Sequence, residues 1–331
     1  MSTKMKPITV LSLFDGMSCG RIALERAGIP VKAYYASEVD KHAIKVSKAN
    51  WNDVTQIGDV TKVSYKDGVL YTEKGEFNVG EIDLVIGGSP CQGFSIAGKQ
   101  LAFDDPRSML YFKFEEILKS INPKYFLLEN VRMKKEHQEL ITSRLGVEPV
   151  GINSKLLSAQ NRNRLYWSNI SSITIPEDLG IKLVNILDDK FGDKYRVKDG
   201  RLSWLKSFGE LKEQGGYVAF NPDKAKCLTV RSEPSWNTTY ILQWPHGTNT
   251  GGLRASDGKT PAITTSSWPA NNLLLNEGLV RRLTPEECEK LQTVPVGYTK
   301  CVSDTQRYKM LGNGWTVDVI AHILKEIKND Y

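Results

Sequence analysis

The chain has 331 residues, of which 40% are hydrophobic and 25% charged, a composition typical of globular proteins. The length predicts one large domain and a smaller one, each able to bury a core. We expect no membrane span, because no run of about 18 apolar residues occurs. The polar residues 1–7 lack the apolar core of a signal peptide, so we expect the protein in the cytoplasm or another reducing compartment.

Cysteine usage and net charge restrict the classes of function. The five cysteines, Cys19, Cys91, Cys227, Cys288 and Cys301, are widely spaced, and none belongs to a Cys-x-x-Cys pair. This pattern argues against a disulfide framework and a structural zinc site, and we expect no metal. The net charge of +6 would suit a polyanionic partner, but many proteins without such a partner share it.

From residue 8 to about residue 170, short apolar runs alternate with stretches of helical spacing. The expected strands cover residues 8–14, 34–38, 83–87 and 125–128, and the expected helices cover residues 21–27, 41–49 and 109–120. Strands that alternate with crossover helices predict an α/β fold with a doubly wound, mostly parallel sheet. In such sheets ligands bind beyond the carboxyl ends of the strands.

The composition changes after about residue 170. Residues 221–276 are rich in Asn, Thr, Ser, Gly and Pro, and contain three of the seven tryptophans. This stretch contains five Lys or Arg residues and three Asp or Glu residues, so it is not a basic arm. It predicts a small, loop- and strand-rich recognition domain. Helical patterns return at residues 284–292, behind a Thr-Pro-Glu-Glu start, and at residues 317–328.

Polar residues follow the first strands of the predicted sheet. Gly16 and Gly20 lie in the first turn, and they do not match the G-x-G-x-x-G spacing that binds a pyrophosphate. Glu38 closes the second strand, where a carboxylate can accept hydrogen bonds from ribose hydroxyls, and Asp59 follows further along. Taken singly, the glycines could simply form a tight turn, and each carboxylate could simply be solvated. Together they predict an adenosine-type ligand without a pyrophosphate.

A cysteine and a glutamate follow the next two strands. Cys91 comes directly after Pro90 in a glycine-rich turn, although most single cysteines are simply small buried residues. A nucleophilic thiolate needs nearby cations, which Arg162 and Arg164 could supply. Glu129 ends the following strand, and a carboxyl group screened from water can stay protonated and donate a proton.

With these clusters in order, the chain resembles the C5-cytosine-specific DNA methyltransferases over nearly its whole length. The matching motifs are Phe14-x-Gly16, Glu38, Asp59-Val60, Pro90-Cys91-Gln92, Glu129-Asn130-Val131, Gln160-x-Arg162-x-Arg164, Arg282-Leu283-Thr284-Pro285-Glu286-Glu287 and Gly312-Asn313-Gly314. Val39 stands where many members of the family have a tryptophan, and several segments are closer to the animal de novo enzymes. Apart from these segments, the chain resembles the bacterial or phage enzymes of the family.

The resemblance implies the Rossmann-like fold of S-adenosylmethionine-dependent methyltransferases, with S-adenosylhomocysteine as product and no metal. The implied cofactor contacts are Phe14, Asp15, Gly16, Gly20, Glu38, Val39, Asp59, Val60, Pro90, Leu110, Asn313 and Gly314. It also implies that Cys91 adds to C6 of a flipped-out cytosine while Glu129 binds N3. Arg164 would bind O2 of the base, and Arg162 would order the site.

The resemblance also implies contacts with double-stranded DNA. The expected DNA-binding residues are Gln92, Ser95 and Gln160, with Arg231 or Arg254 as candidate guanine contacts. A phosphate contact or solvent exposure explains either of these last two arginines equally well.

The implied organisation is a catalytic and cofactor-binding domain (residues 1–175), a target-recognition domain (176–280), a hinge segment (281–304) and a C-terminal helix that returns to the catalytic domain (305–331). We expect a monomer in a bacterial or phage-infected cell, with a separately acting restriction enzyme as a candidate partner. Two alternatives are a tRNA cytosine-5 methyltransferase of the same family and a catalytically inactive DNA-binding regulator. The long recognition region favours duplex DNA over RNA.

Overall fold

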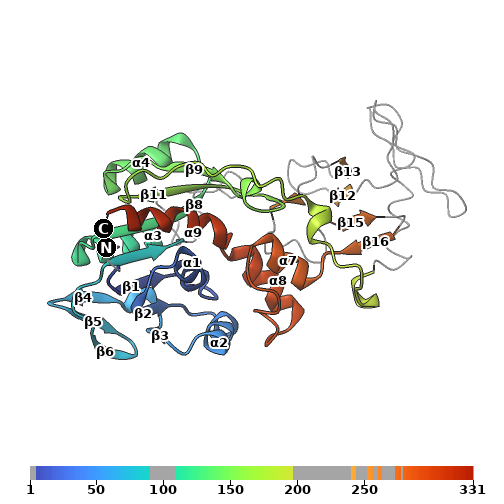
Figure 1. Ribbon diagram of the computed structural model, residues 1–331. Helices are drawn as coiled ribbons and strands as arrows, with labels where there is room; N and C mark the ends of the chain where they lie inside the picture. Colours follow the sequence, from blue (N-terminus) through green and yellow to red (C-terminus); the bar gives the residue numbers. More distant parts are fainter. Residues whose placement is uncertain are drawn as a thin grey trace, which may run out of the picture.

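The computed structural model describes residues 5–89, 109–196, 240–243, 252–255, 260–262, 273–276 and 279–330. The predictions for Pro90, Cys91, Gln92, Ser95 and Arg231 therefore lie outside the described residues, as does the side chain of Arg254. Figure 1 shows a larger α/β part that contains both chain termini and a smaller part that extends away from it.

A seven-stranded sheet forms the centre of the larger part, with the strand order β3-β2-β1-β7-β8-β11-β9. Its strands are β1 (Ile8–Leu13), β2 (Val31–Ser37), β3 (Val54–Gln56), β7 (Leu84–Gly87), β8 (Tyr125–Val131), β9 (Val150–Asn153) and β11 (Asn163–Ser168). The strands from β3 to β8 are parallel, and β11 is antiparallel to both of its neighbours. The doubly wound, mostly parallel α/β fold is therefore confirmed.

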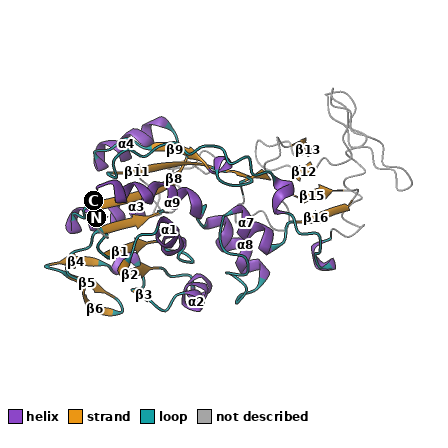
Figure 2. Ribbon diagram, viewed as in Figure 1, coloured by secondary structure: helices purple, strands orange, loops and turns teal. Residues whose placement is uncertain are grey.

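Helices cover both faces of this sheet (Figure 2). They are α1 (Cys19–Ala27), α2 (Lys41–Asn50), α3 (Met109–Ile121), α4 (Lys135–Leu145) and α9 (Val317–Lys325). Successive residues of a strand point to opposite faces, so Val10 packs in the core with α1 and α9, while Leu11 packs in the core with α3 and α4. Every residue of β1 is buried, as a sheet covered on both faces requires.

The strand and helix predictions are confirmed in type and differ at their ends. Strand β8 runs through Glu129 to Val131, three residues beyond the predicted end, because its pairing with β11 continues as far as Arg164 opposite Val131. The last helix ends at Lys325, and a 3-10 turn, η6 (Glu326–Asp330), follows it. The other 3-10 turns are η1 (Val60–Lys62), η3 (Ser154–Leu156), η4 (Leu183–Ile186) and η5 (Asp193–Tyr195).

A small three-stranded sheet was not predicted. It consists of β4 (Ser64–Lys66), β5 (Val69–Thr72) and β6 (Gly75–Asn78), and it projects from the larger part in Figure 1. Asp67 and Gly68 connect β4 to β5 with φ angles of 49° and 82°. An Asp-Gly pair with positive φ at both positions is the preferred two-residue hairpin turn, so the sequence did contain a signal for this element.

Two helices, α7 (Pro285–Leu291) and α8 (Asp304–Asn313), lie between the larger and smaller parts in Figure 1. The predicted start of α7 is confirmed, because the Thr284 hydroxyl accepts from the Glu287 amide while the Glu287 carboxylate accepts from the Thr284 amide. The fully buried Glu287 carboxylate also pairs with Arg281 through two bonds of 2.7 Å. This ion pair fixes the chain where it enters α7.

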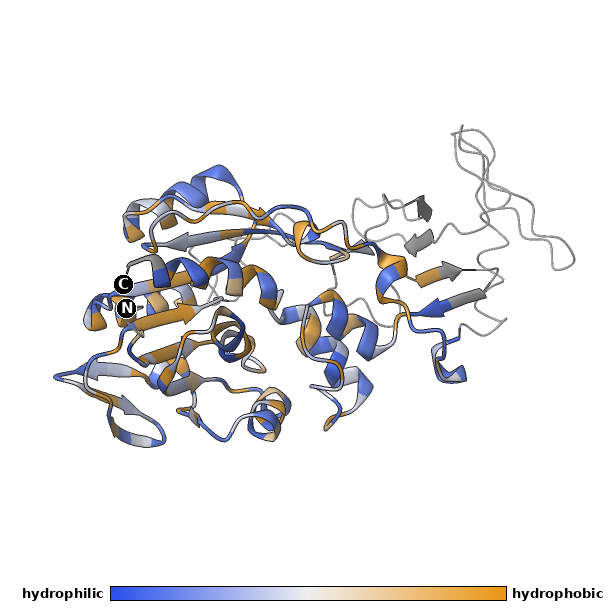
Figure 3. Ribbon diagram, viewed as in Figure 1, coloured by the Kyte–Doolittle hydropathy of each residue, from blue (hydrophilic) through white to orange (hydrophobic). Residues whose placement is uncertain are grey.

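The smaller part contains a four-stranded antiparallel sheet with the order β13-β12-β15-β16. Its strands are β12 (Tyr240–Gln243), β13 (Gly252–Ala255), β15 (Leu273–Asn276) and β16 (Leu279–Arg282), and β10 (Gln160–Asn161) separately pairs with β14 (Thr260–Pro261). Figure 3 shows that hydrophobic residues concentrate in the strands of the larger sheet. Among the described residues, no helix is long and apolar enough to cross a membrane.

Candidate active site

A cavity of about 450 Å³ opens beyond the carboxyl ends of β1, β2, β7 and β8, where the topology predicts a ligand site. The connection between α8 and α9 closes its other side. The predicted site residues that line it are Phe14, Asp15, Gly16, Glu38, Val39, Asp59, Val60, Leu110, Glu129, Arg162, Arg164, Asn313 and Gly314. The structure thus brings residues up to 300 positions apart in the sequence to one cavity.

The turn after β1 is fixed to the end of β2. Phe14 and Gly16 have φ angles of 60° and 62°, a conformation that is unusual for a phenylalanine. The Gly16 amide donates to Glu38 Oε2 at 2.7 Å, and the amides of Val39 and Asp40 donate to Glu38 Oε1 at 2.7 and 2.8 Å. Charge-assisted bonds of this kind are strong, so the Glu38 carboxylate is held at the cavity in one orientation.

Two titratable groups in this turn are buried. Asp15 accepts hydrogen bonds from the hydroxyls of Ser18 and Tyr34 at 2.6 and 2.7 Å, and burial raises its pKa to about 6. Burial likewise raises the pKa of Cys19 to about 12. Cys19 lines the cavity, but its thiol is protonated near neutral pH and is therefore a poor nucleophile.

The residues at the ends of β2 and β3 offer an apolar surface beside carboxylates. Val39 is 69% exposed although it is apolar, and it lines the cavity together with Val60 and Leu110. The Asp59 carboxylate, also in the lining, accepts from the Thr61 amide at 2.8 Å and begins the turn η1. An adenosine presents an apolar ring face, an amino group and two ribose hydroxyls, and this set of groups fits it.

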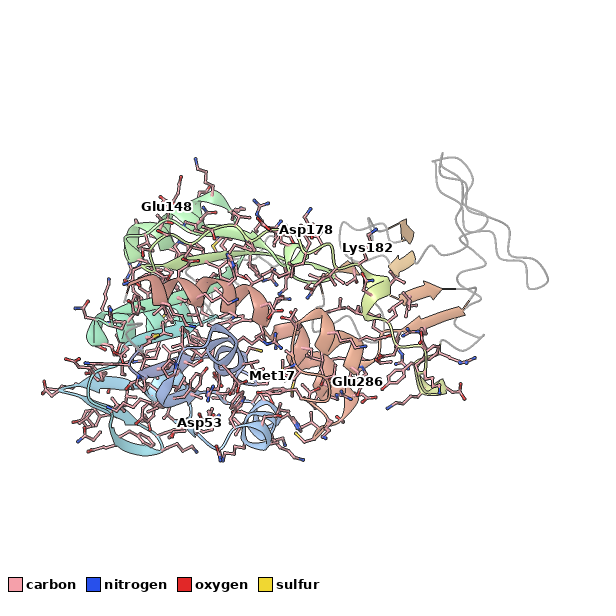
Figure 4. The ribbon with its side chains drawn as sticks, viewed as in Figure 1. Met17, Asp53, Glu148, Asp178, Lys182 and Glu286 are labelled. Atoms are coloured by element: carbon pink, nitrogen blue, oxygen red, sulfur yellow. The ribbon has the colours of Figure 1, made fainter. Side chains whose placement is uncertain are left out.

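Among the described residues predicted to contact the cofactor, Gly20 is not part of the cavity lining. A Cβ atom there would lie 2.4 Å from Ile86 Cδ1 and 2.8 Å from Tyr34 Oη. The glycine therefore allows α1 to pack closely against the sheet. Met17, labelled in Figure 4, is buried nearby, and its carbonyl accepts from the Tyr298 hydroxyl at 2.7 Å.

Glu129 lies at the other end of the same cavity and is 9% exposed. Its Oε1 atom is 2.9 Å from Arg164 Nε, and its Oε2 atom accepts from the Trp315 indole N–H at 3.1 Å. The backbone ahead of Pro90 reaches this point, because Ser89 lines the cavity and its hydroxyl accepts from Asn130 Nδ2 at 3.4 Å.

Gln160 and Arg162 of the Gln-x-Arg-x-Arg motif are buried and form bonds inside the protein. Arg162 is 4% exposed and donates to the carbonyls of Gly312 and Gly314, so it fixes the α8–α9 connection. Gln160, predicted to contact DNA, is fully buried and donates to the Leu291 carbonyl at 3.1 Å and to Gln292 Oε1 at 3.2 Å. The contact of Gln160 with DNA stays a prediction.

Several residues of the cavity lining were not singled out from the sequence. Asp40 caps the start of α2, and its carboxylate pairs with Lys309 at 2.7 Å across the rim of the cavity. Trp315 also lines the cavity, and nothing in its spacing indicated a bond to Glu129. Among the described residues, no group of three or more His, Cys, Asp or Glu side chains could bind a metal.

The mostly parallel sheet, with its cavity between the β2 carboxylate and the β8 carboxylate, is the Rossmann-like fold of S-adenosylmethionine-dependent methyltransferases. The family model described as C-5 cytosine-specific DNA methylase matches residues 8–329, and the chain belongs to this family.

Relatives and solved structures agree with this assignment. The chain is 32% identical to the Type II methyltransferase M1.ScrFI of Lactococcus lactis subsp. cremoris, over 96% of this chain and 77% of the relative. It is 30% identical to the Type II methyltransferase M.HpaII of Haemophilus parainfluenzae, over 96% of this chain and 88% of that relative. The Entamoeba histolytica methyltransferase EhMeth has the same fold, with a TM-score of 0.68 and 18% identity over 98% of this chain and 99% of that one.

Proposed function

We propose that the protein transfers a methyl group from S-adenosylmethionine to C5 of a flipped-out cytosine in a specific duplex DNA sequence. The observation that carries the proposal is that one cavity contains both Glu38, suited to a ribose, and Glu129, suited to a base. A methyl donor at one end and a cytosine at the other would be close enough to react directly.

The cofactor half of the cavity would bind S-adenosylmethionine through this chain's own residues. Glu38 would accept from the ribose hydroxyls, and Asp59 and the Val60 backbone would contact the adenine edge. Val39 would give the ring apolar cover in place of an aromatic residue. The bound cofactor supplies an electrophilic methyl group, and S-adenosylhomocysteine is the product.

Cys91 would be the nucleophile. It follows Ser89 by two residues in the sequence, and Ser89 lines the cavity. Its thiolate would bond to C6 of the cytosine, which makes C5 nucleophilic enough to accept the methyl group. Loss of the C5 proton would then expel the thiolate and restore the ring.

Glu129 would hold a proton at N3 of the same cytosine, and Arg164 would bind O2. These contacts neutralise the charge that addition at C6 creates. They reach the Watson–Crick edge of the base, which is inaccessible in a stacked duplex, so the cytosine must leave the helix. Gln92 and Ser95 would contact the DNA from which it is extruded.

The domain boundaries at residues 175, 280 and 304 belong to the same proposal. Residues 176–280 would read the DNA sequence, with Arg231 and Arg254 as candidate guanine contacts. Exchange of residues 221–276 for those of a relative should change the methylated sequence and leave the chemistry intact. Methylation of the original sequence by the exchanged protein would place recognition elsewhere. We further propose a monomer in the bacterial or phage-infected cytoplasm.

A transfer assay with tritiated S-adenosylmethionine tests the activity on duplex DNA and, separately, on tRNA. We expect label in DNA at cytosine C5 and none in tRNA. Label in tRNA alone would support the RNA-modifying alternative, and binding of DNA without transfer would support the inactive regulator. The Glu129→Gln variant should slow transfer by about 10²–10⁴-fold while it still binds DNA.

A further inference from the structure

We infer that Trp315 is a positioning residue that orients the Glu129 carboxylate and links it to the cofactor half of the cavity. The inference rests on the proposed function, because it concerns how Glu129 is prepared to meet the cytosine. The α8–α9 connection, which carries Trp315, would then help to position the reactive carboxylate on β8.

The two oxygens of Glu129 have donors from different parts of the chain. Arg164, on β11, contacts Oε1 at 2.9 Å, and Trp315, between α8 and α9, donates to Oε2 at 3.1 Å. Rotation of the carboxylate about its last bond would break both contacts at once. The pair of donors therefore keeps the plane of the carboxylate fixed before any base arrives.

Gly88 provides an independent observation for the same contact. A Cβ atom at this position would lie 2.9 Å from Trp315 Nε1 and 3.0 Å from Glu129 Oε2. Gly88 does not have a positive φ, so its backbone would accept another residue. The absence of a side chain at the end of β7 thus makes the space in which the indole and the carboxylate meet.

The backbone on both sides of Trp315 is fixed by buried polar groups. The Gly314 carbonyl accepts from Arg162 at 3.1 Å and from Gln292 Nε2 at 3.2 Å. The Thr316 hydroxyl donates to Gln292 Oε1 at 2.9 Å. Trp315 itself lines the cavity, so its ring would contact the cofactor while its N–H contacts Glu129. Cofactor binding and carboxylate orientation are linked through one side chain.

The contact also has a consequence for how the carboxylate is held. An indole N–H can only donate, so Oε2 acts as the acceptor in this bond. Arg164 holds the other oxygen, Oε1, from β11. Removal of the indole N–H should therefore loosen the orientation of the Glu129 carboxylate.

The Trp315→Phe variant tests this, because it keeps an aromatic ring and removes the N–H. Trp167→Phe is the matched control, since the buried Trp167 indole donates to Thr142 Oγ1 at 3.0 Å on a different part of the fold. We expect Trp315→Phe to lower the single-turnover methyl-transfer rate by about tenfold. We expect the Kd for S-adenosylmethionine to change by less than about threefold, because the aromatic ring is kept. Trp167→Phe should keep the wild-type rate.

A second readout does not depend on activity. The indole ¹⁵N–¹H resonance of Trp315 in the wild-type protein should shift in the Glu129→Gln variant, and that of Trp167 should not. Gly88→Ala should perturb the Trp315 resonance in the same way, and it replaces Trp315→Phe if that variant does not fold. A Trp315 resonance insensitive to Glu129→Gln, or a Trp315→Phe variant with the wild-type rate, would overturn the inference. A wild-type protein that transfers no methyl group to DNA would instead refute the proposed function.

Discussion

The guanidinium of Arg162 donates to the backbone carbonyls of Gly312, at 3.3 Å, and Gly314, at 3.1 Å. Arg162 directly precedes strand β11, which carries Arg164 to the base half of the cavity. Gly312 and Gly314 flank Asn313 at the end of α8, in the cofactor half. The two halves of the cavity are therefore joined by a buried cation bonded to main-chain oxygens.

The Arg162→Lys variant should show what this connection contributes. A lysine has no planar fork with which to bond both carbonyls, so at least one buried oxygen loses its donor. We expect the free energy of unfolding to fall by about 2–3 kcal/mol, measured by urea denaturation. We also expect weaker S-adenosylmethionine binding in calorimetry. Arg282, a more exposed arginine that donates to the Lys194 carbonyl, provides the control, and Arg282→Lys should change neither quantity appreciably. Equal stability of Arg162→Lys and the wild type would contradict this account.

Glu38→Gln should weaken the cofactor site without removing much volume. The amide nitrogen of glutamine cannot accept from the Gly16 amide or from a ribose hydroxyl, and the charge that strengthens these bonds is lost. Since a bond to a charged group contributes about 1.5–3 kcal/mol, the Kd for S-adenosylmethionine should rise about 10- to 100-fold in titration calorimetry. Glu76→Gln, at an exposed position of β6, should leave the Kd unchanged. An unaltered Kd in Glu38→Gln would show that the ribose binds elsewhere.

The buried carboxyl of Asp15 should make stability depend on pH. Burial raises its pKa from 3.8 to about 6, so between these values the folded state binds the proton more tightly than the unfolded state. Folding is then less favourable as the pH rises through this window, with a total cost on the order of 3 kcal/mol above it. Asp15→Asn carries no such charge, so its stability relative to the wild type should increase from about pH 4 to pH 6 and stay constant above. Urea denaturation at a series of pH values without cofactor measures this, and a pH-independent difference would show that Asp15 is not desolvated.

Much of the fold could be predicted from periodicity, because strands such as β1 and β7 are fully buried and mostly apolar, and helical stretches alternate with the strands. The gathering of Glu38 and Glu129 at one cavity followed from topology, since the carboxyl ends of parallel strands share an edge. The polar strands β4 to β6 were missed because each has only three or four residues, although the Asp67-Gly68 turn marked them.

Contacts between distant segments could not be predicted in the same way. The burial of Gln160 and the bond from its amide to the Leu291 carbonyl, at the end of α7, were not predicted. The close packing of α1 against the sheet at Gly20 was likewise not predicted. The bond from Trp315 to Glu129 depends on the path of the α8–α9 connection and on Gly88, neither of which local spacing reveals.

The central claim is that Cys91 attacks C6 of a flipped-out cytosine, and duplex DNA with 5-fluorocytosine at the target site tests it most directly. Fluorine at C5 prevents the final loss of a proton, so the wild-type protein with S-adenosylmethionine should form a complex with DNA that survives denaturing electrophoresis. Cys19→Ala is the matched control, because Cys19 lies in the cavity with a thiol protonated near neutral pH, and it should still form the complex. Cys91→Ala should form none while it still binds S-adenosylmethionine. A Cys91→Ala protein that is trapped, or that still methylates DNA, would contradict the account.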